Sequence, residues 1–178
     1  MKAPLIIWNH RWEYDKNPET FFQLLFDLEA NGYHYEVAIL GERYNKYPKV
    51  FDEAKQRLGE KVVRFGYVET KEAYKKWLLK ADIIPVTSNQ DFFGESLVKA
   101  MYYNCYPLVP NRLVFPEHFP ENTSVDFVYT SYSDLLKKME HLIENIEITR
   151  TTKVSSLVEK YSWSNIAEHY DNTFENMI

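Results

Sequence analysis

The chain has 178 residues, of which 45% are hydrophobic and 26% are charged, with a net charge of −5. These values are typical of a soluble globular protein with a sizeable core, and the acidic balance argues against a broad nucleic-acid-binding surface. No apolar run approaches the roughly 20 residues of a membrane span, and the N-terminus lacks the apolar region of a signal peptide. The single cysteine, Cys105, excludes an internal disulfide, so we expect a packed thiol and a cytoplasmic location.

Strand and helix signals alternate along the chain. We predict strands at residues 5–8, 35–41, 62–67, 82–86, 106–109 and 125–129. Helices are predicted near residues 17–31, 48–59, 71–80 and 94–103 and from residue 131 onward, with C-terminal helices over 153–178 that break near Ser162. Apolar runs such as Leu5-Ile6-Ile7-Trp8 are typical of strands covered on both faces, and Asn17-Pro18 is typical of a helix start.

This alternation predicts an α/β fold with a doubly wound, parallel, six-stranded sheet, in which residues 1–178 form a single Rossmann-like domain. Right-handed crossovers place ligands at the carboxyl ends of the strands of such sheets. The loops that follow the predicted strands are therefore the candidate functional segments.

The loop after the first strand contains Arg11 and Lys16. An arginine offers a fork of donors and a lysine a compact charge, and both suit a diphosphate. The alternative is a solvated turn in which these cations pair with Glu13 and Asp15, and such surface pairs usually contribute little.

The loop after the fourth strand contains Asp91-Phe92-Phe93-Gly94-Glu95 and opens a helix. Free N–H groups at a helix N-terminus favour anions, and a glycine lets a ligand approach the backbone. The sequence therefore predicts a site for a phosphorylated or polyhydroxylated small molecule. The alternatives are that Asp91 caps the helix and that at least one phenylalanine packs in the core.

Two further loops are candidates. Gly66-Tyr67 follows the third strand, where a glycine would let a flat base stack on or hydrogen-bond to the main chain; the alternative is a plain turn. Asn111 lies in a loop with two prolines and a glutamate after the fifth strand, which we expect to form a shaped wall that contacts the ligand. The five histidines show no metal-ligand spacing, so no protein-bound metal and no cofactor are expected.

The order and spacing of these groups resemble the donor-binding, C-terminal half of GT-B glycosyltransferases, within glycosyltransferase family 4. Arg11 and Lys16 stand five residues apart, as the family's phosphate-binding pair does, and Asp91-Phe92-Phe93-Gly94 is similar to its helix-opening motif. The Pro116-Glu117 turn and the tail 161–167 also fit, so the resemblance covers nearly the whole chain. Residues 8–16 and 105–117 look most like the branch that mannosylates queuosine in tRNA.

The resemblance implies a retaining transfer of a sugar from a nucleotide diphosphosugar, GDP-mannose for that branch, to an acceptor hydroxyl. Arg11 and Lys16 would neutralise the leaving diphosphate, and Asp91 would hold the hydroxyls of the donor sugar. The backbone N–H groups of Phe93, Gly94 and Glu95 would line the sugar and phosphates, and Gly66 and Tyr67 would border the base. No bound metal is implied, since the basic pair takes its place.

Two departures from the family pattern stand out. Asp91 replaces the usual glutamate, and Lys99 occupies the position of a second acid that accepts from the ribose hydroxyls. A lysine cannot accept a hydrogen bond, so Glu95 either pairs with Lys99 four residues later or serves the ribose itself.

The chain also matches only one of the two halves of a GT-B enzyme. We therefore expect an N-terminal, acceptor-binding half to be missing, and tRNA to be an acceptor of the full enzyme only. Two alternatives remain open: a non-catalytic nucleotide-sugar-binding module, favoured by Lys99, and a protein-interaction domain, favoured by the 16% aromatic content.

Overall fold

The structure is a computed structural model that describes residues 2–167 and 172. Its strands form one six-stranded sheet in the order β3-β2-β1-β4-β5-β6, and every pair of neighbours is parallel. The predicted doubly wound α/β fold is confirmed, because the strand order reverses direction beside β1.

The element bounds agree with most of the predicted ones. The strands are β1 (Leu5–Trp8), β2 (Glu36–Ile39), β3 (Val62–Phe65), β4 (Ile83–Pro85), β5 (Tyr106–Pro110) and β6 (Val128–Tyr129). The α-helices are α1 (Pro18–Ala30), α2 (Val50–Leu58), α3 (Lys71–Lys80), α4 (Glu95–Tyr102), α5 (Ser124–Phe127), α6 (Tyr132–Glu144) and α7 (Ile146–Thr151). Short 3₁₀ helices are η1 (Tyr14–Lys16), η2 (Gly59–Lys61), η3 (Phe115–His118), η4 (Val154–Leu157) and η5 (Glu159–Tyr161).

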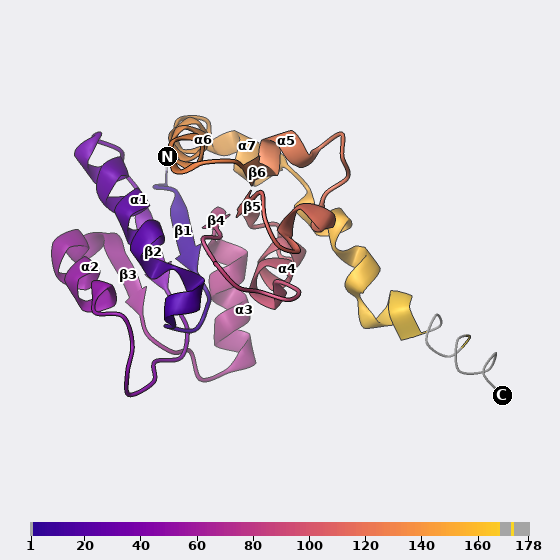
Figure 1. Ribbon diagram of the computed structural model, residues 1–178, viewed down its shortest axis with the longest axis horizontal. Coiled ribbons are helices and arrows are strands. Elements are labelled where there is room, and N and C mark those ends of the chain that lie inside the picture. Colours follow the sequence, from indigo (N-terminus) through magenta and orange to yellow (C-terminus); the bar gives the residue numbers. More distant parts are fainter. Residues whose placement is uncertain (1, 168–171, 173–178) are drawn as a thin grey trace.

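Helices cover both faces of the sheet (Figure 1). Right-handed crossovers place α1 and α2 on one face and α3 and α4 on the other. The long α6 joins α1, where Glu140 accepts from Asn31 Nδ2 at 2.8 Å and Glu144 accepts from the Tyr33 hydroxyl at 2.8 Å. Both faces of the central strands are thus buried, which explains the continuous apolar run of β1.

An aromatic cluster fixes the loop after β1. The Trp12 ring stacks on Phe51 with centroids 4.3 Å apart, and its Nε1 donates to the Leu40 carbonyl at 3.0 Å. Trp8 Nε1 donates to the His10 carbonyl at 2.9 Å. Asn17 ends the loop in the left-handed region at φ 52°, and its side chain accepts from the Thr20 N–H to cap α1.

Two elements differ from the prediction. The strand predicted over 125–129 is a helical turn followed by the two residues of β6. β6 is an edge strand that pairs only with the end of β5, so few ladder bonds oppose a helical turn that continues from Thr123. The short α7 was not predicted.

The C-terminal tail is less regular than predicted. It forms η4 and η5, bends at Ser162, where the break was expected, and becomes helical over 163–167. The rest of the predicted tail helix, at 168–171 and 173–178, lies outside the described residues. Cys105 is buried, as predicted, and no helix among the described residues is both long and apolar enough to cross a membrane.

Candidate functional site

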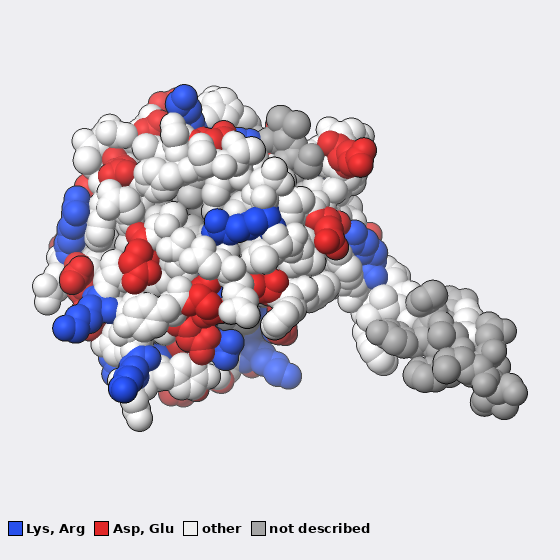
Figure 2. Space-filling view, viewed as in Figure 1, with Lys and Arg blue, Asp and Glu red and all other residues white. Residues whose placement is uncertain are grey.

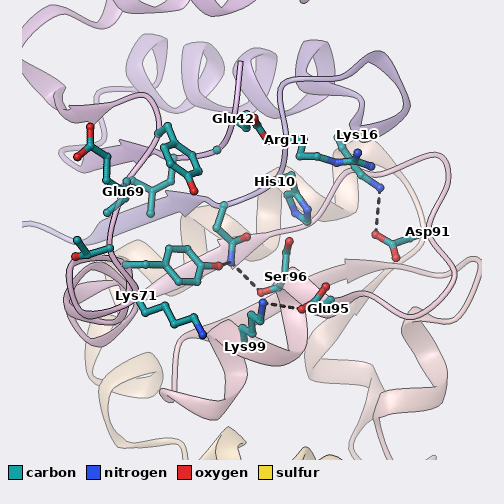
Figure 3. Close-up of a pocket in the computed structure, with 17 residues that line it drawn as sticks. His10, Arg11, Lys16, Glu42, Glu69, Lys71, Asp91, Glu95, Ser96 and Lys99 are labelled. Carbon is teal, nitrogen blue, oxygen red and sulfur yellow. Dashed lines mark hydrogen bonds and ion pairs between the residues drawn. The ribbon is translucent and has the colours of Figure 1, made fainter. Parts of the chain in front are cut away.

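A cavity of about 490 Å³ lies at the carboxyl edge of the sheet, beside the point where the strand order reverses. Its wall comes from the loops after four strands and from the first turns of α3 and α4 (Figure 3). The predicted site residues that line it are Arg11, Lys16, Tyr67, Asp91, Glu95 and Lys99. The topology thus brings three of the four predicted loops to one cavity.

Lys16 is the most enclosed cation of this cavity, with a side chain 11% exposed. Its Nζ lies 3.3 Å from Asp91 Oδ2 and 3.1 Å from Asp15 Oδ2, and it donates to the Gln90 carbonyl at 2.9 Å. Lys16 and Asp91 are 75 residues apart in sequence and meet because β1 and β4 are neighbours. A cation so poorly hydrated interacts strongly with any anion that enters the cavity.

The alternative that Asp91 caps α4 is wrong, because Gly94 occupies the cap position and no side chain makes a cap bond there. Asp91 instead closes the loop in front of the helix. Its Oδ1 accepts from the Gly94 N–H at 2.7 Å and from the Phe93 N–H at 3.3 Å. Burial raises the pKa of Asp91, but the bonds from Gly94 and the charge of Lys16 outweigh it, and the net pKa is lowered. Asp91 is therefore ionised, and the N–H groups of Phe93 and Gly94 point to its carboxylate.

Arg11 lies at the rim of the cavity, opposite the end formed by α3 and α4 (Figure 3). Its side chain is 55% exposed and pairs with Glu13 at 3.1 Å. The solvated ion pair that the sequence left open is thus present, and the same guanidinium still lines the cavity. Such an exposed pair is weak and is easily exchanged for a phosphate.

Lys99 and Glu95 form an ion pair of 2.6 Å along α4, as expected for residues four apart. Both side chains line the cavity. Tyr67 lines the opposite wall with a half-exposed ring. Gly66 stands just outside the wall with φ +105°, where a side chain would strain the turn out of β3.

The prediction that at least one phenylalanine of the loop packs in the core is wrong. Phe92 is 90% exposed and Phe93 is 42% exposed. The buried residue is Gly94, which is packed so closely on Phe115 that an added Cβ would lie 3.2 Å from that ring. Because the glycine anchors the loop, both rings point away from the core, and the Phe93 ring meets Tyr161 edge-on at 5.0 Å.

Asn111 does not reach this cavity. It lines a separate hollow of about 220 Å³ with Arg112 and Tyr129, and its N–H donates to the Tyr129 carbonyl at 2.9 Å. The backbone pairing of β5 with β6 places it there. The wall that was predicted after β5 therefore lines this separate hollow and not the 490 Å³ cavity.

Sequence reasoning missed several residues of the wall, above all Asn9 and His10. Asn9 Nδ2 donates to the Ser96 carbonyl at 2.8 Å and to the Tyr74 hydroxyl at 3.1 Å, which ties the end of β1 to α4 and α3. The sequence did contain a signal for Asn9 and His10, since two polar residues directly follow a buried strand. The other missed residues of the wall are Leu40, Gly41, Glu42, Val68, Glu69, Thr70, Lys71, Tyr74 and Ser96.

His10 is buried and electrically neutral. Burial, followed by the nearby charge of Lys16, lowers its pKa to about 4. Its Nε2 and the Asn9 Oδ1 have no hydrogen-bond partner among the described residues. Across residues 2–167 and 172, no three His, Cys, Asp or Glu side chains gather in a way that could hold a metal ion.

Comparison with known proteins places the chain among glycosyltransferases and related synthases. The tRNA-queuosine alpha-mannosyltransferase of Drosophila melanogaster is 39% identical over 134 residues, which are 75% of this chain and 34% of that protein. A probable sucrose-phosphate synthase of Thermosipho melanesiensis is 22% identical over 177 residues, which are 98% of this chain and 41% of that protein. The chain thus spans well under half the length of these curated relatives.

Solved structures show the same fold. The sucrose-phosphate synthase of Thermosynechococcus elongatus superposes with a TM-score of 0.79 and 15% identity, over 99% of this chain and 46% of that one. The HepE protein of Anabaena, in complex with UDP, superposes with a TM-score of 0.75 and 16% identity, over 98% of this chain and 49% of that one. The family described as Glycosyl transferases group 1 matches residues 1–170. The chain belongs to this family and has the fold of a Rossmann-like half of a GT-B glycosyltransferase.

Proposed function

We propose that this chain is the donor-binding half of a retaining glycosyltransferase, which transfers a sugar from a nucleotide diphosphosugar to an acceptor hydroxyl. The observation that carries the proposal is the cavity at the strand-order reversal, where Arg11 and Lys16 lie at the end nearest Asp91. The family assignment supports it.

The diphosphate is proposed to lie against Arg11 and Lys16. During transfer the bond between the anomeric carbon and the diphosphate oxygen breaks, and negative charge grows on that oxygen. Lys16 is enclosed enough to stabilise this charge strongly, and Arg11 exchanges its Glu13 partner for a phosphate. No metal ion is part of this proposal, because the two cations take the role of neutralising the leaving group.

Asp91 is proposed to hold the donor sugar through Oδ2. Its Oδ1 is engaged by the Gly94 N–H, so the other oxygen, now near Lys16, is the one available to sugar hydroxyls. The ribose would be served by Glu95, which gives up Lys99, since a lysine offers no acceptor. Tyr67 would border the base on the opposite wall.

For the donor and acceptor we propose GDP-mannose and a queuosine in tRNA. This rests on the similarity to the Drosophila mannosyltransferase, which the chain covers only in part. On the face shown in Figure 2, acidic and basic side chains are interspersed rather than gathered into a basic patch. We therefore assign tRNA binding to the acceptor-binding half that would complete the enzyme. Cytoplasmic location and the single-domain boundary stay predictions from the sequence.

A second candidate is a non-catalytic nucleotide-sugar-binding module, and Lys99 is the observation that favours it. Lys99→Glu separates the two readings of this residue. If Lys99 marks a decayed ribose site, the substitution tightens nucleotide-sugar binding. If the Glu95–Lys99 pair is adapted to the donor, the substitution weakens binding.

Calorimetric titration with GDP, UDP, ADP and their sugar conjugates tests the proposal. Arg11→Ala should weaken binding of the preferred nucleotide by about tenfold, the value of one charge-assisted hydrogen bond. Arg57→Ala is the matched control, because Arg57 is also 55% exposed and faces a glutamate but lies outside the cavity. Saturable binding of one nucleotide family, weakened only by Arg11→Ala, is expected. No binding by the folded chain across the panel contradicts a donor-binding role.

A further inference from the structure

The end of β1 carries two unpartnered polar atoms that belong to one cavity wall. Asn9 Oδ1 and His10 Nε2 are both buried without a hydrogen-bond partner among the described residues, and both residues line the 490 Å³ cavity. Leaving a buried polar atom unpaired costs roughly 1–3 kcal/mol. Two such atoms on consecutive residues indicate that a bound molecule completes this wall.

Two neighbours, Trp8 and Gly41, fix the backbone carbonyl of His10. Trp8 Nε1 donates to its carbonyl at 2.9 Å, and the Trp8 ring meets the imidazole edge-on at 5.2 Å. Gly41 packs so closely that an added Cβ would lie 1.9 Å from the same carbonyl oxygen. The backbone of His10 therefore keeps its place between the Arg11–Lys16 end of the cavity and Ser96 (Figure 3).

A small movement brings His10 Nε2 to the cavity. The residue is 3% exposed, and the outer torsion of a histidine side chain is soft, so a modest ring rotation turns Nε2 toward a ligand. Phosphate oxygens only accept hydrogen bonds, so Nε2 must carry the proton in such a contact. Arg11, Lys16 and His10 would then supply donors to one diphosphate from a single loop.

We infer that His10 Nε2 donates a hydrogen bond to the diphosphate of the bound donor and so acts as a third phosphate-binding residue. The inference rests on the proposed function and deepens it. Asn9 keeps its positioning role through Nδ2 and presents Oδ1 to a hydroxyl of the same ligand.

The proposed contact between His10 and the diphosphate can be measured through the pKa of His10. Lys16 lowers its pKa, whereas Asp91 and Asp15 raise it, and burial is the largest influence. A bound diphosphate adds negative charge within hydrogen-bond distance, which raises the pKa of His10 from its value of about 4. Near pH 5 the chain should therefore take up a fraction of a proton when the donor binds. Glu42 and Glu95 also line the cavity, so a variant must identify the group that titrates.

The experiment is calorimetry at pH 5 in two buffers of different ionisation enthalpy, with whichever nucleotide sugar of the panel binds the unchanged chain. Nucleotide sugars suit this test because both of their phosphates are esterified, so each keeps one negative charge and neither takes up a proton in this pH range. Proton uptake in the unchanged chain that disappears in His10→Gln is the expected result. His10→Ala should also weaken binding by about tenfold. His34→Ala is the control, since His34 is exposed and lies outside the cavity.

The outcomes separate the two proposals. If the unchanged chain binds a nucleotide sugar without proton uptake, or if His10→Ala binds it equally well, the role of His10 is refuted and the donor site stands. If no nucleotide sugar binds the unchanged chain, the proposed function fails, and the inference fails with it. If His10→Ala does not fold, His10→Gln still decides, because proton uptake that persists in this variant comes from another group and refutes the role of His10.

Discussion

Asp91 offers a quantitative test of how the site is built, because one carboxylate closes the loop before α4 and pairs with Lys16. The loop contact consists of Oδ1 and the Gly94 N–H at 2.7 Å, and the ion pair consists of Oδ2 and Nζ at 3.3 Å. Losing such a hydrogen bond costs about 1 kcal/mol. Losing the ion pair costs about 1 kcal/mol more, since Lys16 keeps Asp15 as a second partner. Asp91→Ala should therefore lower the free energy of unfolding by about 2 kcal/mol.

Asp91→Asn separates the two contributions. The amide oxygen keeps the acceptor for the Gly94 N–H but loses the charge opposite Lys16, so about 1 kcal/mol should be lost. For a chain of this size 1 kcal/mol corresponds to roughly 2–4 °C in Tm. We expect Tm to fall by roughly 4–8 °C in Asp91→Ala and by roughly 2–4 °C in Asp91→Asn, measured by calorimetry and urea unfolding at pH 7.

The pH dependence of the Asp91→Asn variant tests whether the charge of Asp91 stabilises the fold. The folded-state pKa of Asp91 is lowered, so its charge stabilises the fold above the unfolded pKa, and this stabilisation is lost as the pH falls through the folded pKa. The Tm difference between the chain and Asp91→Asn should therefore shrink on acidification. A double-mutant cycle with Lys16→Met should give a coupling energy of about 1 kcal/mol. Equal losses in the Ala and Asn variants, or a difference that grows in acid, would refute this account of the loop.

Two further predictions concern Gly41 in the cavity wall and His118, which bonds to the loop before α4. Gly41→Ala should destabilise the chain by roughly 2–6 kcal/mol in urea unfolding, because φ is +113° and the new Cβ would lie 1.9 Å from the His10 carbonyl oxygen. Gly32→Ala is the control, since it has open space around it and should cost only about 1 kcal/mol. His118→Phe should cost roughly 1–3 kcal/mol, because it leaves the Phe93 carbonyl without its 2.8 Å partner. Burial above all lowers the pKa of His118, so the unfolded chain binds the proton first and stability falls below about pH 6.5. Between pH 7 and pH 5, calorimetry should therefore show a smaller loss of Tm in His118→Phe than in the unchanged chain. A larger loss in the variant would contradict the view that His118 makes the fold sensitive to acid.

The sequence by itself determined the layout of the sheet and the order of the loops along the site. Continuous apolar runs such as Leu5–Trp8 are local signals of strands buried on both faces, and the Asn17-Pro18 cap is a local signal of a helix start. Once the alternation of strands and helices was read, the handedness of crossovers placed Lys16 and Asp91 at one edge. Their contact across 75 residues follows from topology.

The tertiary structure alone decided which side chains of these loops face the cavity. His10 was one polar residue of a turn in the sequence, and its burial beside Gly41 and Trp8 depends on the neighbouring strand and on an aromatic ring. At least one of Phe92 and Phe93 was expected in the core, yet Gly94 occupies the buried position of their loop. Orientation of this kind depends on contacts between residues far apart in the chain, and local patterns do not encode them.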